Sequence, residues 1–302
     1  MNRIVLAACL WALAAFPAWA QQPKANIGYI GAADFTPLFV AKDKGFFDKH
    51  GLDATLTRAQ IAPNVGPAII SGDLQIGMGT APNLLHAAEG GLPLVAVAGA
   101  SRMKKGNPIA GLVGRSGAAI KTATDLRGKT IASPGLNTML TEMLEKWLHD
   151  HKVARGEYTM VEVVFPQQYD MLKSGRVDAA ITIEPFRTKM ISDGTGFNVA
   201  DYVGEVNPDL LAVLWMARRD WAEANPKAVQ AFRAAYAEAI QWCAKNPEES
   251  KKIQAKYLGF ASPVLPDYGV EVKLSDVEFF EKVERELGKL RGPVDVSKLV
   301  WK

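Results

Sequence analysis

The segment SGDLQIGMGTAPN (Ser71–Asn83) decides the fold, because it has a counterpart in SGRVDAAITIEPF (Ser174–Phe186). Ser-Gly opens both segments, an apolar run follows, and each run closes on a proline, at Pro82 and Pro185. The two serines, the two glycines and the two prolines are each 103 positions apart. In both segments the pattern predicts a helix that ends at Ser-Gly, a buried strand of about six residues and a helix that begins at the proline. Two such units predict two similar lobes.

Short β-branched runs alternate with helical stretches around both segments, which is typical of βαβ units and a mainly parallel sheet. The expected fold class is therefore α/β, with two lobes that are each a mainly parallel sheet flanked by helices and with a cleft between them. The expected strands are 25–31, 52–57, 74–79 and 92–100 in the first lobe and 129–133, 159–165 and 177–183 in the second, with a buried strand at 210–220 that returns to the first lobe. The expected helices are 36–51, 65–72, 83–91, 137–151, 167–175 and one from Pro185.

The Gly- and Thr-rich segment 111–128 predicts the passage from the first lobe to the second. The expected division assigns residues 25–113 and 212–302 to lobe one and residues 119–205 to lobe two, with crossings near 114–118 and 206–211.

Helix signals mark several boundaries. Thr36 can cap the first helix with Pro37 at its first position, and Gly51 follows its end. Helices are also expected after Asn225-Pro226 and Asn246-Pro247. The first of these helices has one apolar face, formed by Val229, Phe232, Tyr236 and Ile240. Such a face predicts that the helix packs against the core.

The N-terminal 20 residues predict a cleaved secretory signal. Arg3 precedes an apolar run that ends at Phe16, and Ala18-Trp19-Ala20 has the small residues that signal peptidase accepts. The run is shorter than the roughly 20 residues of a spanning helix. Cys9 lies too close to Arg3 for a lipid attachment site, so a lipid tether is not expected. The only other cysteine, Cys243, has no partner after cleavage and is expected to be a small core residue.

Composition excludes several classes of protein. The 302 residues are 48% hydrophobic and 22% charged with a formal net charge of +3, which argues against disorder and against a membrane bundle. No dense basic tract with interleaved aromatic residues occurs, so no nucleic acid partner is expected. The basic segment 102–106 is interpreted as a solvated face.

Catalytic, metal-binding and cofactor-binding patterns are weak. His149 and His151 point to different helix faces and His86 stands alone in an apolar helix, so no metal site is expected. Gly77 and Gly79 begin like a dinucleotide loop, but a proline occupies the position of the third glycine. No cofactor and no enzymatic activity are therefore expected.

Four predicted helix starts remain as the candidate site: 35–37, 80–83, 137–139 and 184–186. Backbone amides at helix starts favour an anionic group without any charged side chain. Capping alone is the alternative explanation for Thr36, Thr80 and Asn137, but the symmetric occurrence of such starts in both lobes favours a binding function.

Several ordered motifs resemble the substrate-binding proteins of ABC importers for nitrate, sulfonates, taurine and related small molecules. The first is FTPLFVAKDKGFFDKHGLDATL, a proline-led helix followed by Ala-Lys-x-x-Gly-Phe-Phe and Gly-Leu before a strand. The resemblance covers most of residues 25 to 300. It continues through four further segments: 68–98, 125–135, 171–186 and 292–300.

The resemblance implies a two-lobed, type II-like periplasmic binding protein that closes on a small ligand and presents it to the transmembrane subunits of an ABC permease. A periplasmic location and a monomer are expected. The ligand-binding residues that it implies are Tyr29, Asp34, Phe35, Thr80, Ala81, Asn83, Ser101, Ser133, Asn137, Thr138, Gln167, Glu184, Phe186 and Arg187.

Two differences from the family pattern leave the identity of the ligand undetermined. Relatives commonly have a Gly-Gly-Ser-like stretch at the position of residues 59–66, and many have Trp at the position of Ile183. The family also includes pyrimidine-binding proteins and enzymes of pyrimidine or thiamine-precursor synthesis. An enzyme on the same scaffold is the alternative, although the cysteine-rich motif of that branch is absent. A regulator is a further alternative, but 1–22 offers no DNA-binding segment.

Three side-chain hypotheses follow. Asn83 and Asn137 are expected to touch the ligand, because an amide offers both a donor and an acceptor. Glu184 is expected either to be held by Arg187, three positions on, or to accept an N–H group of the ligand; alternatively it only favours the positive end of its helix. Three aromatic rings could sandwich a flat ligand: Tyr29, Phe35 and Phe186. They favour an organic ligand over bare nitrate.

Overall fold

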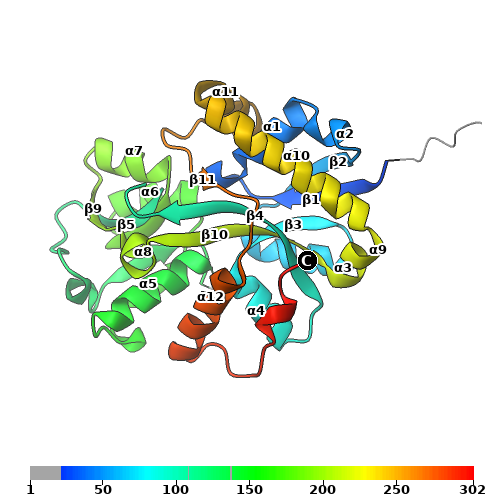
Figure 1. Cartoon of the computed structure of the whole chain (residues 1–302). Helices are drawn as coiled ribbons and strands as arrows, with labels where there is room; N and C mark the ends of the chain where they lie inside the picture. The colour runs from blue at the N-terminus through cyan, green and yellow to red at the C-terminus, as the bar shows by residue number, and fades with distance from the viewer. Residues whose placement is uncertain (1–21, 108, 137) are drawn as a thin grey trace, which may run out of the picture.

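The structure is a computed structural model that describes residues 22–107, 109–136 and 138–302. The expected signal peptide, with Cys9, and the candidate ligand residue Asn137 lie outside the described residues. Two β-sheets form the centres of two lobes (Figure 1). The first sheet has the order β11-β4-β10-β3-β1-β2: β11 (Asp267–Tyr268), β4 (Leu94–Lys104), β10 (Asp209–Arg218), β3 (Ile76–Gly79), β1 (Lys24–Tyr29) and β2 (Asp53–Arg58). The second has the order β7-β6-β8-β5-β9: β7 (Thr159–Glu162), β6 (Thr130–Ser133), β8 (Ala179–Ile183), β5 (Ala110–Arg115) and β9 (Gly196–Ala200).

Helices flank both sheets, as expected for an α/β fold. With the first sheet we group α1 (Thr36–Asp43), α2 (Phe46–Lys49), α3 (Val65–Ser71), α4 (Ala81–Glu89), α9 (Arg219–Ala224), α10 (Pro226–Lys245), α11 (Pro247–Leu258) and α12 (Leu274–Glu286). With the second we group α5 (Met139–Asp150), α6 (Phe165–Lys173), α7 (Phe186–Ser192) and α8 (Tyr202–Val206). None of the helices in the described part of the chain combines the length and the apolar character that crossing a membrane requires.

Two long strands, β4 and β10, connect the lobes. They pair antiparallel along their whole length, from Leu94 beside Arg218 to Lys104 beside Asp209, and run together through the middle of the molecule (Figure 1). The chain leaves the first sheet after Lys104 and enters the second at Ala110. The expected crossing at 114–118 is thus too late, because the apolar run of β5 already belongs to the second sheet; the return between α8 and β10 falls within the expected 206–211.

The two repeated segments, Ser71–Asn83 and Ser174–Phe186, form the same structure. α3 ends at Ser71 and α6 at Lys173, and in both cases the following glycine, Gly72 or Gly175, has a positive φ that a side chain rarely tolerates. The buried strands β3 and β8 follow, and α4 and α7 begin within one residue of the expected prolines, at Ala81 and at Phe186. The repeated sequence pattern therefore marks equivalent strands in the two lobes.

The sheets differ from the expected parallel pattern. Only β2-β1-β3 and β7-β6-β8 are parallel, while the remaining neighbours pair antiparallel. The long strand β10 pairs antiparallel with both β3 and β4 as it returns to the first sheet. Three strands, β5, β9 and β11, were not expected. β5 and β9 each carry a glycine and so resemble loop sequence, and β11 has only two residues.

The first helix also differs from the expectation. It is divided at Gly45, whose φ of 71° separates α1 from α2. Thr36 does not cap it, because its hydroxyl donates to the carbonyl of Ala33 at 2.7 Å and accepts from Gln254 Nε2 at 2.7 Å.

An aromatic cluster fills the core of the first lobe. Trp215 packs edge-on against Phe35, Phe232 and Tyr236, with ring centroids 5.4 to 5.6 Å apart. Each buried ring contributes roughly 1.5–3 kcal/mol relative to an exposed one. The predicted face of α10 is buried at Val229, Phe232 and Tyr236, and Cys243 is buried and free, as expected.

Candidate functional site

Four strand ends define the candidate site. β1 and β3 are parallel neighbours in the first sheet, and β6 and β8 are parallel neighbours in the second, so their carboxyl ends lie together in pairs. α4, α5 and α7 follow three of these ends, and a short 3-10 turn at Ala33–Phe35 follows β1. Ligands in open α/β sheets bind at such carboxyl ends.

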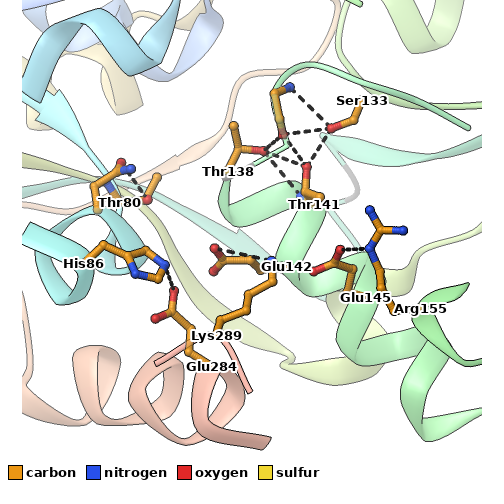
Figure 2. Close-up of polar contacts among 12 residues, drawn as sticks. Thr80, His86, Ser133, Thr138, Thr141, Glu142, Glu145, Arg155, Glu284 and Lys289 are labelled. Atoms are coloured by element: carbon orange, nitrogen blue, oxygen red, sulfur yellow. Dashed lines mark hydrogen bonds and ion pairs between the residues drawn. The ribbon is translucent and has the colours of Figure 1, made fainter. Parts of the chain in front are cut away.

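Thr80 and Asn83 form the start of α4. Asn83 Oδ1 accepts from the backbone N–H of Thr80 at 3.0 Å and from its hydroxyl at 2.9 Å (Figure 2). Capping therefore occupies both lone pairs of the Asn83 carbonyl, and its Nδ2 group is what it can offer a ligand. Ala81, which follows the cap, is buried.

The residues after β1 are largely buried. Asp34 is 7% exposed and accepts a hydrogen bond of 2.5 Å from the hydroxyl of the buried Ser101. Burial raises the pKa of Asp34, and this hydrogen bond opposes the rise. Tyr29 packs edge-on against Phe39, and Phe35 is fully buried against Trp215. The structure thus places Phe35 in the core.

A hydroxyl network forms the start of α5. Thr141 Oγ1 lies 2.6 Å from Ser133 Oγ and 3.0 Å from Thr138 Oγ1, and it donates to the carbonyl of Gly135 at 2.6 Å (Figure 2). Thr138 is the N-cap residue. Thr141 was not among the expected residues, although Thr138-x-x-Thr141 spacing places the two hydroxyls on one face.

Glu184 is held within its own lobe. Its Oε1 lies 3.3 Å from Nη1 of Arg187, and its Oε2 accepts from the backbone N–H of Thr188 at 3.2 Å. Arg187 also donates to Asn198 Oδ1 at 2.8 Å. Of the alternatives for Glu184, the structure shows the ion pair with Arg187 together with a hydrogen bond to the first turn of α7.

Three phenylalanine rings meet beside Glu184. Phe186 stacks on Phe165 with centroids 6.0 Å apart and meets Phe260 edge-on at 6.0 Å. Phe260 follows α11, so this contact joins the two lobes. Phe186 therefore has these partners, rather than forming the expected sandwich with Tyr29 and Phe35, whose rings pack in the first lobe. Gln167 is exposed on α6.

Arg58 is a cation that the sequence analysis missed. It ends β2 beside Tyr29, and its guanidinium covers Gly31, where an added Cβ would lie 2.3 Å from Nη2. Only the register of β1 and β2 places it there; nothing in its local sequence indicates it.

A cavity of about 340 Å³ lies elsewhere, beside the ion pairs of Arg102 with Asp209 and Asp276. None of its lining residues belongs to the four strand ends, so we keep it separate from the candidate site.

The two lobes and the paired strand ends define a periplasmic-binding-protein fold. The solved alkanesulfonate-binding protein SsuA of Xanthomonas axonopodis pv. citri bound to MOPS has a TM-score of 0.79 at 19% identity, over 93% of this chain and 99% of that one. The periplasmic nitrate-binding protein NrtA of Synechocystis PCC 6803 has a TM-score of 0.77 at 19% identity, over 92% and 86%. The fold expected from the sequence motifs is confirmed.

The chain belongs to the NMT1/THI5-like family, whose sequence profile matches residues 32–250. It is 28% identical over 270 residues to the nitrate/nitrite binding protein NrtA of Nostoc sp., a match that covers 80% of this chain and 60% of that protein. It is 29% identical over 241 residues to the taurine-binding periplasmic protein of Escherichia coli, covering 79% and 72%. The chain thus spans about three fifths of NrtA. These relatives confirm the resemblance to binding proteins of ABC importers.

Proposed function

We propose that the protein is a solute-binding protein, without catalytic activity, that captures a small anionic or polar organic molecule between its lobes. The observation that carries the proposal is the pair of helix starts at α4 and α5, one from each lobe, each with a side-chain cap at the carboxyl end of a parallel strand. First-turn amides there attract an anion through aligned backbone dipoles. Relatives named for nitrate, taurine and sulfonate support an anionic group.

We propose an organic anion of the sulfonate type as the ligand. Arg187 pairs with the buried Glu184 carboxylate, so the charge that follows β8 is compensated and does not repel an anion. Arg58 adds a positive charge at the edge of the first lobe. The Phe165, Phe186 and Phe260 rings offer an apolar surface that suits an organic group better than bare nitrate.

We further propose that, apart from the buried Phe35, the ligand contacts are those expected from the sequence, with Thr80, Asn83 and Thr138 contributing polar groups and Phe186 an apolar surface. The remaining proposals concern the whole protein: export with cleavage after Ala20, a periplasmic location, a monomeric state, and delivery of the ligand to an ABC permease. The names of relatives that are ABC transport components support the last.

A thermal-shift and calorimetric panel tests the proposal with purified protein and taurine, an alkanesulfonate, nitrate, bicarbonate and a pyrimidine. A ligand at 100 times its Kd stabilises the folded state by about 2.7 kcal/mol, which is readily measured. Thr138→Ala is expected to weaken binding by about tenfold. The matched control is Thr159→Ala, because Thr159 is exposed at the opposite, amino end of a strand in the same sheet. No stabilisation by any of these anions, or equal loss in both variants, would contradict the proposed site.

A further inference from the structure

A second group of ionisable side chains lies beyond the starts of α4 and α5. His86 on α4, Glu142 on α5 and Glu284 on α12 converge (Figure 2), and one ligand atom from each lies within 4.8 Å of the others. The expectation that His86 stands alone is therefore wrong, because helices distant in sequence bring the two carboxylates to it. These three residues are called the His86 cluster below.

The two carboxylates of the His86 cluster are buried without adequate partners. The side chains of Glu142 and Glu284 are 0% exposed. Both oxygens of Glu142 and Oε2 of Glu284 have no hydrogen-bond partner within the described chain. Glu284 Oε1 has the His86 ring nitrogen Nε2 at 3.1 Å. Buried carboxylates in this position need a cation or a proton.

The neighbouring basic side chains make their short contacts elsewhere. Lys289 Nζ lies 2.5 Å from Glu145 but 3.9 Å from Glu142. Arg155 also pairs with Glu145, at 3.0 Å (Figure 2). Glu145 thus has two basic partners, while Glu142 has only the distant lysine and Glu284 only the imidazole among the ion pairs of the described residues.

Burial and the short distances within the His86 cluster shift the pKa values of Glu142 and His86. Burial, and then the neighbouring Glu284, raise the pKa of Glu142 to about 9. The contact with Glu284 raises the pKa of His86. A cation that binds these side chains therefore has to displace their protons.

We propose that His86 Nε2 and the carboxylates of Glu142 and Glu284 form a binding site for a divalent transition-metal cation of the Zn²⁺ type. Imidazole and carboxylate are ligands that Zn²⁺ accepts, at about 2.0–2.2 Å, and three protein ligands leave a fourth position for water. The spread of 4.8 Å requires a modest contraction of side chains around the ion. The 38% exposure of His86 provides access from solvent.

The site would join the lobes, since Glu142 belongs to the helix that follows β6 whereas His86 belongs to the helix that follows β3. Glu284 on α12 packs beside both helices. A bound ion would therefore fix α5 against α4 and α12.

The experiment measures Zn²⁺ binding to the full mature protein, freed of metal with a chelator and then dialysed. We expect one Zn²⁺ per chain by elemental analysis, a rise in melting temperature with Zn²⁺ but not Mg²⁺, and visible absorption bands with Co²⁺. Glu284→Gln and His86→Gln are expected to weaken Zn²⁺ binding by about tenfold or more. The matched controls are Glu286→Gln on the same helix as Glu284 and His149→Gln on an exposed face of α5, which should bind normally.

A measurement without variants keeps the proposal testable if these substitutions disturb folding. Zn²⁺ is expected to protect His86 from carbethoxylation by diethyl pyrocarbonate, read by peptide mass spectrometry, while the exposed His149 remains reactive. No Zn²⁺ binding, or binding that leaves His86 reactive, would overturn the site and leave a proton shared by Glu142 and Glu284. Binding that survives both glutamine substitutions would place the ion elsewhere and also overturn it.

Discussion

Replacing Thr141 with valine tests whether the hydroxyl network shapes the second-lobe half of the site. Thr141 is 0% exposed, and its hydroxyl contacts Ser133 Oγ, Thr138 Oγ1 and the carbonyl of Gly135. Valine keeps the shape of threonine but removes all three contacts. The loop between β6 and α5, which those contacts hold, is the loop that places the first turn of α5.

The expected loss of folding free energy in Thr141→Val depends on which hydrogen bonds remain around Gly135. The carbonyl of Gly135 still accepts from Ser133 Oγ at 2.9 Å and from Thr138 Oγ1 at 3.1 Å, so it does not become an unsatisfied buried acceptor. Each of the three lost hydrogen bonds contributes about 0.5–1.5 kcal/mol net, which gives a destabilisation of about 1.5–4.5 kcal/mol for Thr141→Val. For a protein of this size the melting temperature should fall by roughly 3–18 °C.

Differential scanning calorimetry and isothermal titration calorimetry measure stability and ligand affinity in the same samples. The control, Thr159→Val, changes an exposed threonine of β7 and should alter neither. We expect Thr141→Val to lower both the melting temperature and the affinity for the organic anion. An unchanged melting temperature would refute the energetic reasoning, and a lower melting temperature with unchanged affinity would remove this loop from the site.

Three further outcomes are expected. Burial raises the pKa of Asp34 in the folded protein, so its carboxyl group keeps its proton to a higher pH when folded than when unfolded. The stability that this protonated carboxyl contributes is therefore lost as the pH rises through the folded pKa. Asp34→Asn should therefore flatten this decline in thermal scans, and parallel pH profiles would contradict it. Gly31→Ala should displace the Arg58 side chain and weaken anion binding as Arg58→Gln does, with little change in melting temperature; normal affinity in calorimetry would exclude Arg58. A double-mutant cycle of Phe186→Ala and Phe260→Ala in chemical denaturation should show a coupling of about 0.5–1.5 kcal/mol, and additivity would argue against their contact.

Local sequence signals predicted much of the fold. The Ser-Gly pairs end helices because Gly72 and Gly175 adopt a backbone conformation that glycine favours, and a proline cannot continue a strand but can open a helix. These are rules of short range. They locate β3, β8 and the helices that follow them, and so they locate the strand ends of the candidate site.

Long-range contacts could not be predicted in the same way. β5 contains glycines where neighbouring strands pack closely, as at Gly114, where an added Cβ would lie 2.8 Å from the ring of Phe197. Its sequence therefore resembles a loop, although its partner β9 requires the glycine. The position of Arg58 likewise depends on strand register, and the His86 cluster depends on α12, about 200 residues after α4 in the chain.

The same two helices carry both proposed sites. Thr80 is the N-cap of α4, which carries His86 about 9 Å further along its axis, and Thr138 is the N-cap of α5, which carries Glu142 about 6 Å along. A ligand held between the helix starts and a cation held between the helix sides would each favour one relative placement of α4 and α5. Because both act on that single placement, the cation would change ligand affinity by the same factor by which the ligand changes cation affinity. The buried carboxylates of Glu142 and Glu284, which are costly to leave unpaired, are then explained as part of the contact between the lobes whose placement the ligand also sets.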